Sequence, residues 1–519
     1  MTTMLFATAH GFGEGVEKLG VIAVALLGAV VVLGRSPRVS ERSRALAMLA
    51  VLVVTPALLL ADIWHTSQLT HLRHHPAEAG AAVVLGVIVV LALAVLIHRE
   101  PRAFPLLAIF ALPFRLPIAT GGSTSNLLIP LYLVVGAGTL AYLTPRLRYR
   151  SEHPERAGPI LLEWLLAAAV VLYALQAAYS ADFSKALENM VFFYVPFALL
   201  FALLREVKWT RELLLQCLAV AVALAVVFAG IGFVEYDRKQ LFLNPKVVAA
   251  DQYGNYFRVN SLFFDPNIYG RFLALVMIGV MTGVLWSVRR REVLLGGAVL
   301  LWLLAGLVTS FSQSSIAALL LGLAVLAAYR WDVRGTIYVT VALAAIALVV
   351  VAVAPPSLHL GLTGKGGSAS NATSGRTKLI EGGLRLFADR PLQGFGPGSF
   401  AQEYRAHEHV TSSSATSASH TIPVTVAAEQ GIVGLALYVA LLVSGFVMLF
   451  RGAGRSPPRI ALAACFAALV LHTFTYADFL EDPETWVLLG IGVALACAPG
   501  SGEPLRGGQS RVEPAALTS

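Results

Sequence analysis

Long apolar segments recur along almost the whole chain, and they constrain its fold more than any other feature. A transmembrane helix needs about 20 consecutive, mostly apolar residues. About fifteen segments of the 519-residue chain approach this requirement. The candidate spans are, in chain order, 19–34, 45–61, 80–97, 103–118, 126–143, 159–178, 186–204, 212–234, 267–286, 293–309, 312–329, 336–354, 424–450, 458–476 and 485–498. We therefore expect an all-α, polytopic membrane bundle of about 12–15 transmembrane helices.

Composition excludes the other broad classes of protein. Only 13% of the residues are charged and 57% are hydrophobic, whereas a soluble domain carries about 25% charged residues. This excludes an ordinary cytosolic enzyme, a disordered protein and a disulfide-built secreted domain. The net charge of +8 is expected in cytoplasmic loops and at sites for anionic lipid groups, so no nucleic-acid partner is predicted. The three cysteines lie in apolar runs without a CxxC pair, which indicates neither a disulfide framework nor a zinc site.

The candidate span at 103–118 is weaker than the others. Pro105, Pro113 and Pro117 interrupt it, and Arg115 lies within it. Proline removes a backbone donor and breaks helices, so this segment is expected to be a broken or re-entrant helix.

Basic side chains alternate between the loops in the way that sets membrane orientation. The loop after the first candidate span holds four arginines, and every second loop after it is basic again. Intervening short loops such as 309–314 and 477–484 contain no Lys or Arg. Because short basic loops stay in the cytoplasm, the pattern predicts an N-terminus outside and a C-terminus inside.

Two of the outside loops are long, and long loops in compact proteins are often functional. The second opens with a Gly/Ser-rich stretch, 361–375. It continues with 376–389, whose Leu379, Leu384 and Phe387 predict an amphipathic helix on the membrane surface. A Gly-rich run at 394–398 predicts either a tight turn or backbone amides offered to an anion. The expected division of the chain is 1–234 N-terminal transmembrane helices, 235–266 extracytoplasmic loop, 267–354 transmembrane helices, 355–423 large extracytoplasmic catalytic loop containing short helices, 424–498 C-terminal transmembrane helices and 499–519 cytoplasmic tail.

Basic residues in the two long loops break the orientation rule. Arg258 lies in the first loop, and Arg376 and Arg390 lie in the second. Long loops cross membranes whatever their charge, so these residues either have no special role or form a basic mouth for an anionic substrate. Arginine suits the second role, because its planar guanidinium binds phosphate oxygens with two hydrogen bonds.

Other polar residues are candidates for chemistry at the same membrane face. His420 precedes a span and is a candidate base for a hydroxyl group, although a loop histidine is usually only solvated. Glu429 lies one helical turn into an apolar segment, where a carboxylate is expected to be paired or functional. Asp265 or Asn267 is expected to cap the helix that starts there. The acidic loop 478–484 predicts a solvated turn or a part of an acceptor site.

Several of these segments together resemble one known signature. Residues 374–400, SGRTKLIEGGLRLFADRPLQGFGPGSF, and 420–442, HTIPVTVAAEQGIVGLALYVALL, resemble the O-antigen ligase and O-antigen polymerase superfamily. The shared pattern is S-G-R, a short helix, a P-L-x-G-x-G-x-G-x-F turn, and His followed nine residues later by Glu and G-x-x-G-L. Upstream, 258-RVNSLFFDPN-267 resembles the family's Arg before a D-P-N step, and 312-SQSSIAALLLGL-323 resembles its Ser-rich helix start.

The resemblance implies a GT-C-type glycosyltransferase of the bacterial cytoplasmic (inner) membrane. Such enzymes move a glycan from a polyprenyl (undecaprenyl) diphosphate donor to a glycan or lipid-linked sugar acceptor on the extracytoplasmic face. They invert the sugar and need neither a metal ion nor another cofactor. By matching positions, Arg258 and Arg376 would bind the diphosphate, and His420 would lie by the acceptor hydroxyl. Glu429 and Asn267 are the further expected substrate-binding residues.

Other functions stay open on the sequence. A ligase would use lipid A–core sugar as its acceptor, and a polymerase would use another repeat unit. A transporter of a small anion is a different class, but it should show internal repeats and ionisable residues at mid-membrane. The chain shows no repeat, and its candidate residues cluster in outside loops, which favours the enzyme. A glycan-binding scaffold without catalysis is the third alternative.

Overall fold

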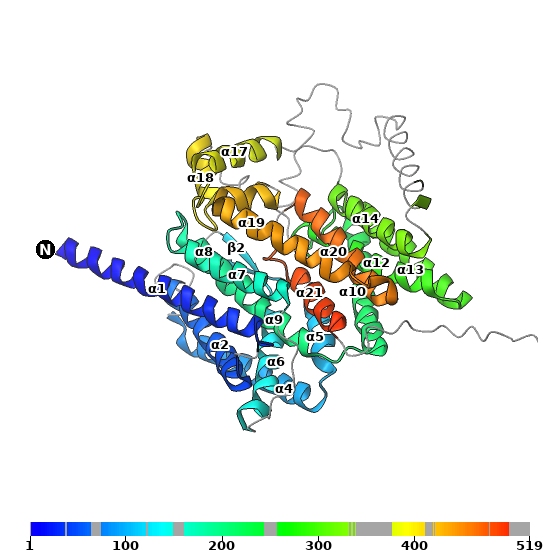
Figure 1. Ribbon diagram of the computed structural model, residues 1–519, viewed down its shortest axis with the longest axis horizontal. Helices are drawn as coiled ribbons and strands as arrows, with labels where there is room; N and C mark the ends of the chain where they lie inside the picture. Colours follow the sequence, from blue (N-terminus) through cyan, green and yellow to red (C-terminus); the bar gives the residue numbers. More distant parts are fainter. Residues whose placement is uncertain are drawn as a thin grey trace, which may run out of the picture.

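The computed structural model is a bundle of long apolar helices (Figure 1). It describes residues 2–36, 39–63, 74–120, 123–148, 160–242, 257–331, 334–335, 338, 376–409, 419, 421–476 and 478–497. Within these residues, nine helical stretches are long and apolar enough to cross a membrane, which confirms a polytopic all-α membrane fold. The expected span at 336–354 (apart from Tyr338), the stretch 361–375 and the tail 499–519 lie outside the described residues.

The helices follow the expected spans closely. The nine membrane-crossing stretches comprise α1 (Thr2–Val32), α4 (Pro76–Arg99), the continuous run α8 (Phe183–Asn189), η2 (Met190–Tyr194) and α9 (Val195–Glu206), α10 (Arg211–Arg238), α12 (Pro266–Trp286), α13 (Arg290–Thr309), α14 (Gln313–Arg330), α19 (Ile422–Phe450) and α20 (Pro457–Thr475). The other helices are α2 (Glu41–Ile63), α5 (Ala103–Ala111), α6 (Ile129–Arg148), α7 (Leu161–Ala177), α17 (Arg376–Asp389), α18 (Phe400–Glu408), η4 (Ala453–Arg455) and α21 (Pro483–Ala496).

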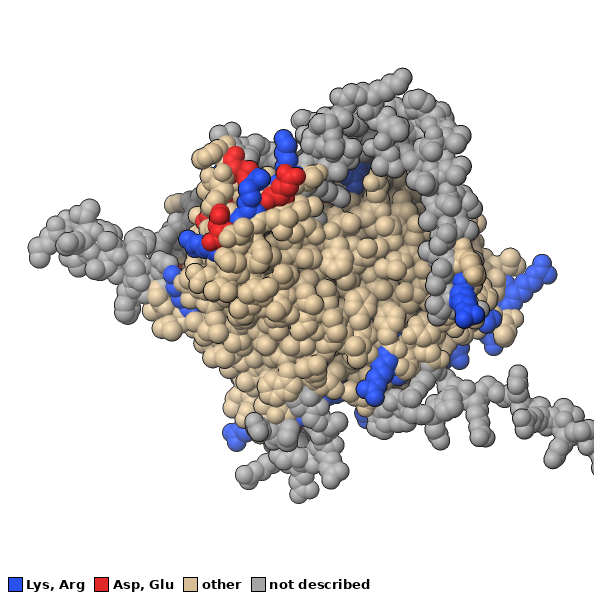
Figure 2. Space-filling view, turned by 45° about the horizontal axis from the view of Figure 1, so that its top comes forward, with Lys and Arg blue, Asp and Glu red and all other residues tan. Residues whose placement is uncertain are grey.

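The surface of the bundle separates apolar from charged side chains. In Figure 2 a broad band without Lys, Arg, Asp or Glu covers the middle of the visible face, and charged side chains lie at its margins. Helix α4 also has an apolar surface, because Val84, Leu85 and Ile88 are all more than half exposed. A surface this apolar suits contact with lipid tails, as a membrane-spanning bundle requires.

The segment at 103–118 is not a full span. Helix α5 ends at Ala111, and two antiparallel strands follow, β1 (Leu116–Thr120) and β2 (Ser123–Leu127), with Leu116 opposite Leu127. The break falls just before Pro113, in keeping with the proline effect on helices. The expected broken helix is confirmed, and the span over the whole segment was wrong.

One end of the bundle gathers segments that are far apart in the sequence. The starts of α12, α14, α19 and α21 lie there with the ends of α7, α10, α13 and α20, as the contacts below show. We call it the turn end, because residues 390–400 form a Gly-rich turn on it beside α17 and α18 (Figure 1). The opposite end holds the end of α9 and the starts of α2 and α7.

Candidate functional site

The Gly-rich turn between α17 and α18 depends on glycine at three positions. Gly394, Gly396 and Gly398 have φ angles of 67°, 97° and 78°, in the left-handed region that other residues rarely adopt. There is also no room for a side chain at Gly396, because its Cβ atom would lie 2.2 Å from the Cα atom of Ser180. The expected tight turn is confirmed.

The turn docks on a break in helix α19. Gly431 has φ 64° and ψ −163°, so the helix is interrupted inside a membrane-spanning stretch. The freed groups find partners in the turn. The carbonyl of Glu429 accepts from the Gly396 amide at 2.7 Å, and the amide of Ile432 donates to the Pro391 carbonyl at 2.8 Å. Such replacement makes a broken membrane helix tolerable. The Gly396 amide is used in this way, and the alternative that the run offers backbone amides to a bound anion stays a prediction.

Glu429 ties α19 to the start of α18. Its carboxylate oxygen Oε1 accepts a hydrogen bond from the Phe400 amide at 3.0 Å, and the Gly398 amide also bonds to this carboxylate. The carboxylate therefore accepts hydrogen bonds from backbone amides at the N-terminus of α18 that have no partner within the helix. The expectation that Glu429 is paired is confirmed, and its role in substrate binding stays a prediction.

Arg258 is held beside the start of α12. Its Nε donates to the Ser310 carbonyl at 3.1 Å, and its terminal nitrogen donates to Oδ1 of Asn267 at 3.2 Å. The same Asn267 oxygen accepts from the Ser312 hydroxyl at 2.9 Å. Asp265 caps α12 by accepting from the Asn267 amide at 2.6 Å, as expected. The Arg-DPN segment and the Ser-rich helix start, 45 residues apart between Asn267 and Ser312, thus form one polar network.

The acidic loop at 478–484 folds against a buried arginine. Arg271, one turn after Asn267 on α12, forms ion pairs with Asp482 and, at 3.1 Å, with Glu484. The side chains of Arg271 and Asp482 are both only 1% exposed. A buried guanidinium requires counter-charges, because breaking such a pair leaves an uncompensated charge. The expectation of a solvated turn was wrong.

The same loop connects the Arg258 network to a pocket. Asp265 lies close enough to raise the pKa of Tyr476 and Asp478, although burial is the main cause of both shifts. Further along the loop, Glu481 faces Glu429, since each lines the same pocket between α7, α19 and the loop.

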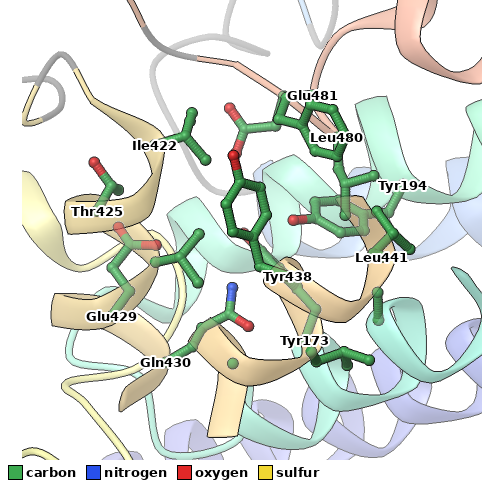
Figure 3. Close-up of a pocket in the computed structure, with 15 residues that line it drawn as sticks. Tyr173, Tyr194, Ile422, Thr425, Glu429, Gln430, Tyr438, Leu441, Leu480 and Glu481 are labelled. Atoms are coloured by element: carbon green, nitrogen blue, oxygen red, sulfur yellow. The ribbon is translucent and has the colours of Figure 1, made fainter. Parts of the chain in front are cut away.

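Figure 3 shows this pocket, with tyrosine rings and two carboxylates around it. Its lining residues are Ala169, Tyr173, Tyr194, Ile422, Thr425, Val426, Glu429, Gln430, Gly434, Leu437, Tyr438, Leu441, Phe479, Leu480 and Glu481. Burial raises the pKa of Glu481 to about 8, and the negative charge of Asp478 adds to the effect. Asn189 holds Glu481 by donating from Nδ2 to Oε1 at 2.9 Å.

Two of the predicted site residues cannot be placed. His420 lies outside the described residues, and Arg376 begins α17 but its side chain is outside them too. The neighbours of His420 are at the start of α19, where the Ser419 hydroxyl donates to the Thr421 carbonyl at 2.7 Å. The structure therefore brings together Arg258 and Asn267, and separately docks Glu429 on the turn.

Sequence reasoning missed Arg271 and underrated Glu481. The signal for Arg271 was its position inside an apolar span, since an ionisable residue there is a functional candidate by default. Nothing local identified Glu481 as a pocket residue, because its partner Asn189 lies 292 residues away.

The arrangement supplies fixed cationic and acidic groups at one end of a membrane bundle. Arg258 offers a guanidinium already positioned by two acceptors, and Glu481 offers a carboxylate whose raised pKa suits proton exchange near neutral pH. Among the described residues, no group of three His, Cys, Asp or Glu side chains is placed to hold a metal ion.

Comparison with known families gives one match. The family model described as O-antigen ligase matches residues 298–439, which run from α13 through the Gly-rich turn into α19. No curated protein matches the chain. The match supports the resemblance and covers the Ser-rich helix start, the Gly-rich turn and the first part of α19, whereas Arg258, Arg271 and Glu481 lie outside it.

Proposed function

We propose that this chain, whose residues 298–439 match the O-antigen ligase family model, transfers a glycan from a polyprenyl (undecaprenyl) diphosphate to a sugar acceptor that is part of a lipid or a glycan. The reaction takes place at the turn end, which faces away from the cytoplasm of the bacterial inner membrane, with the N-terminus outside and the C-terminus inside. The proposal includes inversion at the sugar and no requirement for a metal ion.

The observation that carries the proposal is the meeting of the family segments at this end. The network of Arg258, Asn267 and Ser312 and the docked Gly-rich turn belong to distant parts of the chain. They lie at one end of the bundle, on either side of the loop that holds Asp478 and Glu481.

In the proposed step, an acceptor oxygen attacks the anomeric carbon while the bond to the diphosphate breaks. Negative charge then grows on the departing diphosphate, and Arg258 and Arg376 stabilise it more than in the ground state. Asn267 fixes the guanidinium of Arg258 through their 3.2 Å hydrogen bond. His420 takes the proton from the acceptor hydroxyl, and Glu429 holds the turn in place.

The test uses the full-length protein in lipid nanodiscs, with an undecaprenyl-diphosphate glycan and candidate acceptors. Arg258→Ala and Arg376→Ala should each lower transfer by about 10²–10³-fold while leaving expression intact. Arg258→Lys should also be poor, because a point charge cannot replace the guanidinium fork. Arg290→Ala, at an exposed position on α13, is the matched control and should retain full activity.

His420→Ala separates the two halves of the site. It should lower turnover by about 10²–10⁴-fold without weakening competition by undecaprenyl diphosphate. Near-normal transfer in both Arg258→Ala and Arg376→Ala would refute the diphosphate site. An equal loss of turnover and donor binding in His420→Ala would refute its role as a base.

A further inference from the structure

The pocket beside α19 has a chemistry that the proposed diphosphate site does not use. It is open to solvent at its mouth, and the space between its walls and mouth is about 640 Å³. Its walls come from α7, η2, α19 and residues 479–481. Figure 3 shows Glu429 and Glu481 on different sides of the Tyr438 ring.

Aromatic and polar groups are interleaved in the lining. The rings of Tyr173 and Tyr194 lie 4.2 Å apart between centroids and form one wall. Tyr438 is only 7% exposed, and its hydroxyl is directed toward Thr473. The pocket thus offers aromatic side chains next to polar ones.

Two carboxyl groups line the pocket. Glu481 is anchored through Asn189, and Glu429 lies across the pocket. The nearby cation Lys185 is engaged by Glu188 at 3.2 Å, and the described lining residues include no Lys or Arg. An anionic ligand would therefore lose its hydration in a low-dielectric site without gaining a counter-charge, which is unfavourable. The pocket is thus unsuited to a diphosphate, a carboxylated sugar or a phosphorylated lipid.

We propose that this pocket binds a neutral or amino sugar ring, and that Glu481 is its main hydrogen-bonding residue. Sugar hydroxyls and ammonium groups donate hydrogen bonds that carboxylates accept, and the apolar face of a pyranose ring stacks on tyrosine. The inference rests on the proposed function, because the ring belongs to the acceptor or to the donor glycan.

The direct test is saturation-transfer difference NMR on the full-length protein in nanodiscs, with methyl β-glucoside, glucosamine and glucuronate as probes. Methyl glucoside and glucosamine should bind, and glucuronate should bind at least about tenfold more weakly. Glu481→Gln should weaken glucosamine by about tenfold, and Glu481→Asp should recover part of the loss. The control Glu292→Gln, at an exposed position on α13, should change nothing.

Two outcomes overturn the proposal. One is glucuronate binding as tightly as glucosamine, and the other is equal binding of all probes by Glu481→Gln and the unmodified protein. In transfer assays, a KM raised only for the acceptor assigns the ring to the acceptor, and a KM raised only for the donor assigns it to the donor glycan.

Failure of the proposed function would look different. Arg258→Ala should bind the sugar probes normally while losing transfer. If Arg258→Ala transfers normally, the diphosphate site fails and the sugar pocket stands on its binding data. If the probes do not bind while Arg258→Ala abolishes transfer, the pocket proposal alone fails.

Discussion

The two ends of the bundle both bury arginine, but they balance its charge differently. At the opposite end Arg44 pairs with Glu206 at 2.9 Å, and Arg205 pairs with Glu163 and, at 3.7 Å, with Glu206, so that two guanidiniums meet two carboxylates. At the turn end the single guanidinium of Arg271 contacts two carboxylates, those of Asp482 and Glu484. Other carboxyl groups lie close to this cluster or line the pocket, namely Asp265, Glu429, Asp478 and Glu481.

The difference separates a structural charge cluster from a functional one. Inside an apolar bundle, a buried charge is tolerated when it is paired and hydrogen-bonded. The opposite end meets this condition with balanced pairs, and Arg44 also donates to the Ala202 carbonyl. The turn end also has Arg115 near Asp478 and Lys185 near Glu481, but burial still raises the pKa of both acids. Acids that are buried and only partly compensated therefore mark the site.

The largest effect on stability is expected at the opposite end. Arg205→Met leaves Glu163 buried without its partner, which should lower the free energy of unfolding by about 3–5 kcal/mol. Thermal unfolding of the detergent-purified protein measures the loss. The double variant Arg205→Met/Glu163→Gln should recover much of it, because no uncompensated charge remains. Transfer activity per folded molecule should stay normal in Arg205→Met. A loss of transfer in the folded variant would show that the opposite end is not purely structural.

A smaller effect is expected from the Gly-rich turn. Gly396→Ala places a methyl group 2.2 Å from the Ser180 Cα atom at a φ of 97°. The strain should cost about 1–3 kcal/mol and should lower transfer, because the turn no longer docks on α19. Gly283→Ala on α12 is the matched control, since no heavy atom lies within 4 Å of its Cβ position. It should be neutral or stabilise by up to about 1 kcal/mol, and transfer retained by Gly396→Ala would show that docking is dispensable.

Local patterns predicted much of this fold. Helix α17 covers Arg376–Asp389, as the sequence indicated, because helical periodicity is a local signal. Its apolar face differs in detail, since Leu384 is 50% exposed and Leu386 is buried with Leu379 and Phe400. That face packs on α18 and α19, so its membrane-surface placement stays a prediction. The Gly-rich turn was predictable for the same reason, because glycine readily adopts the positive φ angles that tight turns need.

The acidic loop shows where sequence reasoning ends. Four carboxyl groups in eight residues, 477–484, predict a solvent-exposed turn when the segment is considered alone. Their burial depends on Arg271, which the chain supplies more than 200 residues earlier. The break at Gly431 has the same origin, because the freed backbone groups bond to distant residues such as Gly396 and Pro391. Long-range pairing of this kind has no local signature.

The last expected effect is a pH dependence at the turn end. Glu481 faces Asp478, Lys185, Glu188 and Glu429, and burial is the main reason for its raised pKa of about 8. In the unfolded chain a glutamate titrates near pH 4.3. Between these values the folded protein holds a proton that the unfolded chain has lost. The free energy of unfolding should therefore fall as the pH rises from about 5 to about 8.

Glu481→Gln should remove this slope, because an amide cannot ionise. The variant and the unmodified protein should unfold at similar temperatures at pH 5, and the variant should be more stable at pH 8.5. Thermal unfolding across this range measures the difference, with Glu292→Gln as the exposed control. Parallel curves for Glu481→Gln and the unmodified protein would show that Glu481 is ionised throughout, and the excess charge at the turn end would then need another counter-ion.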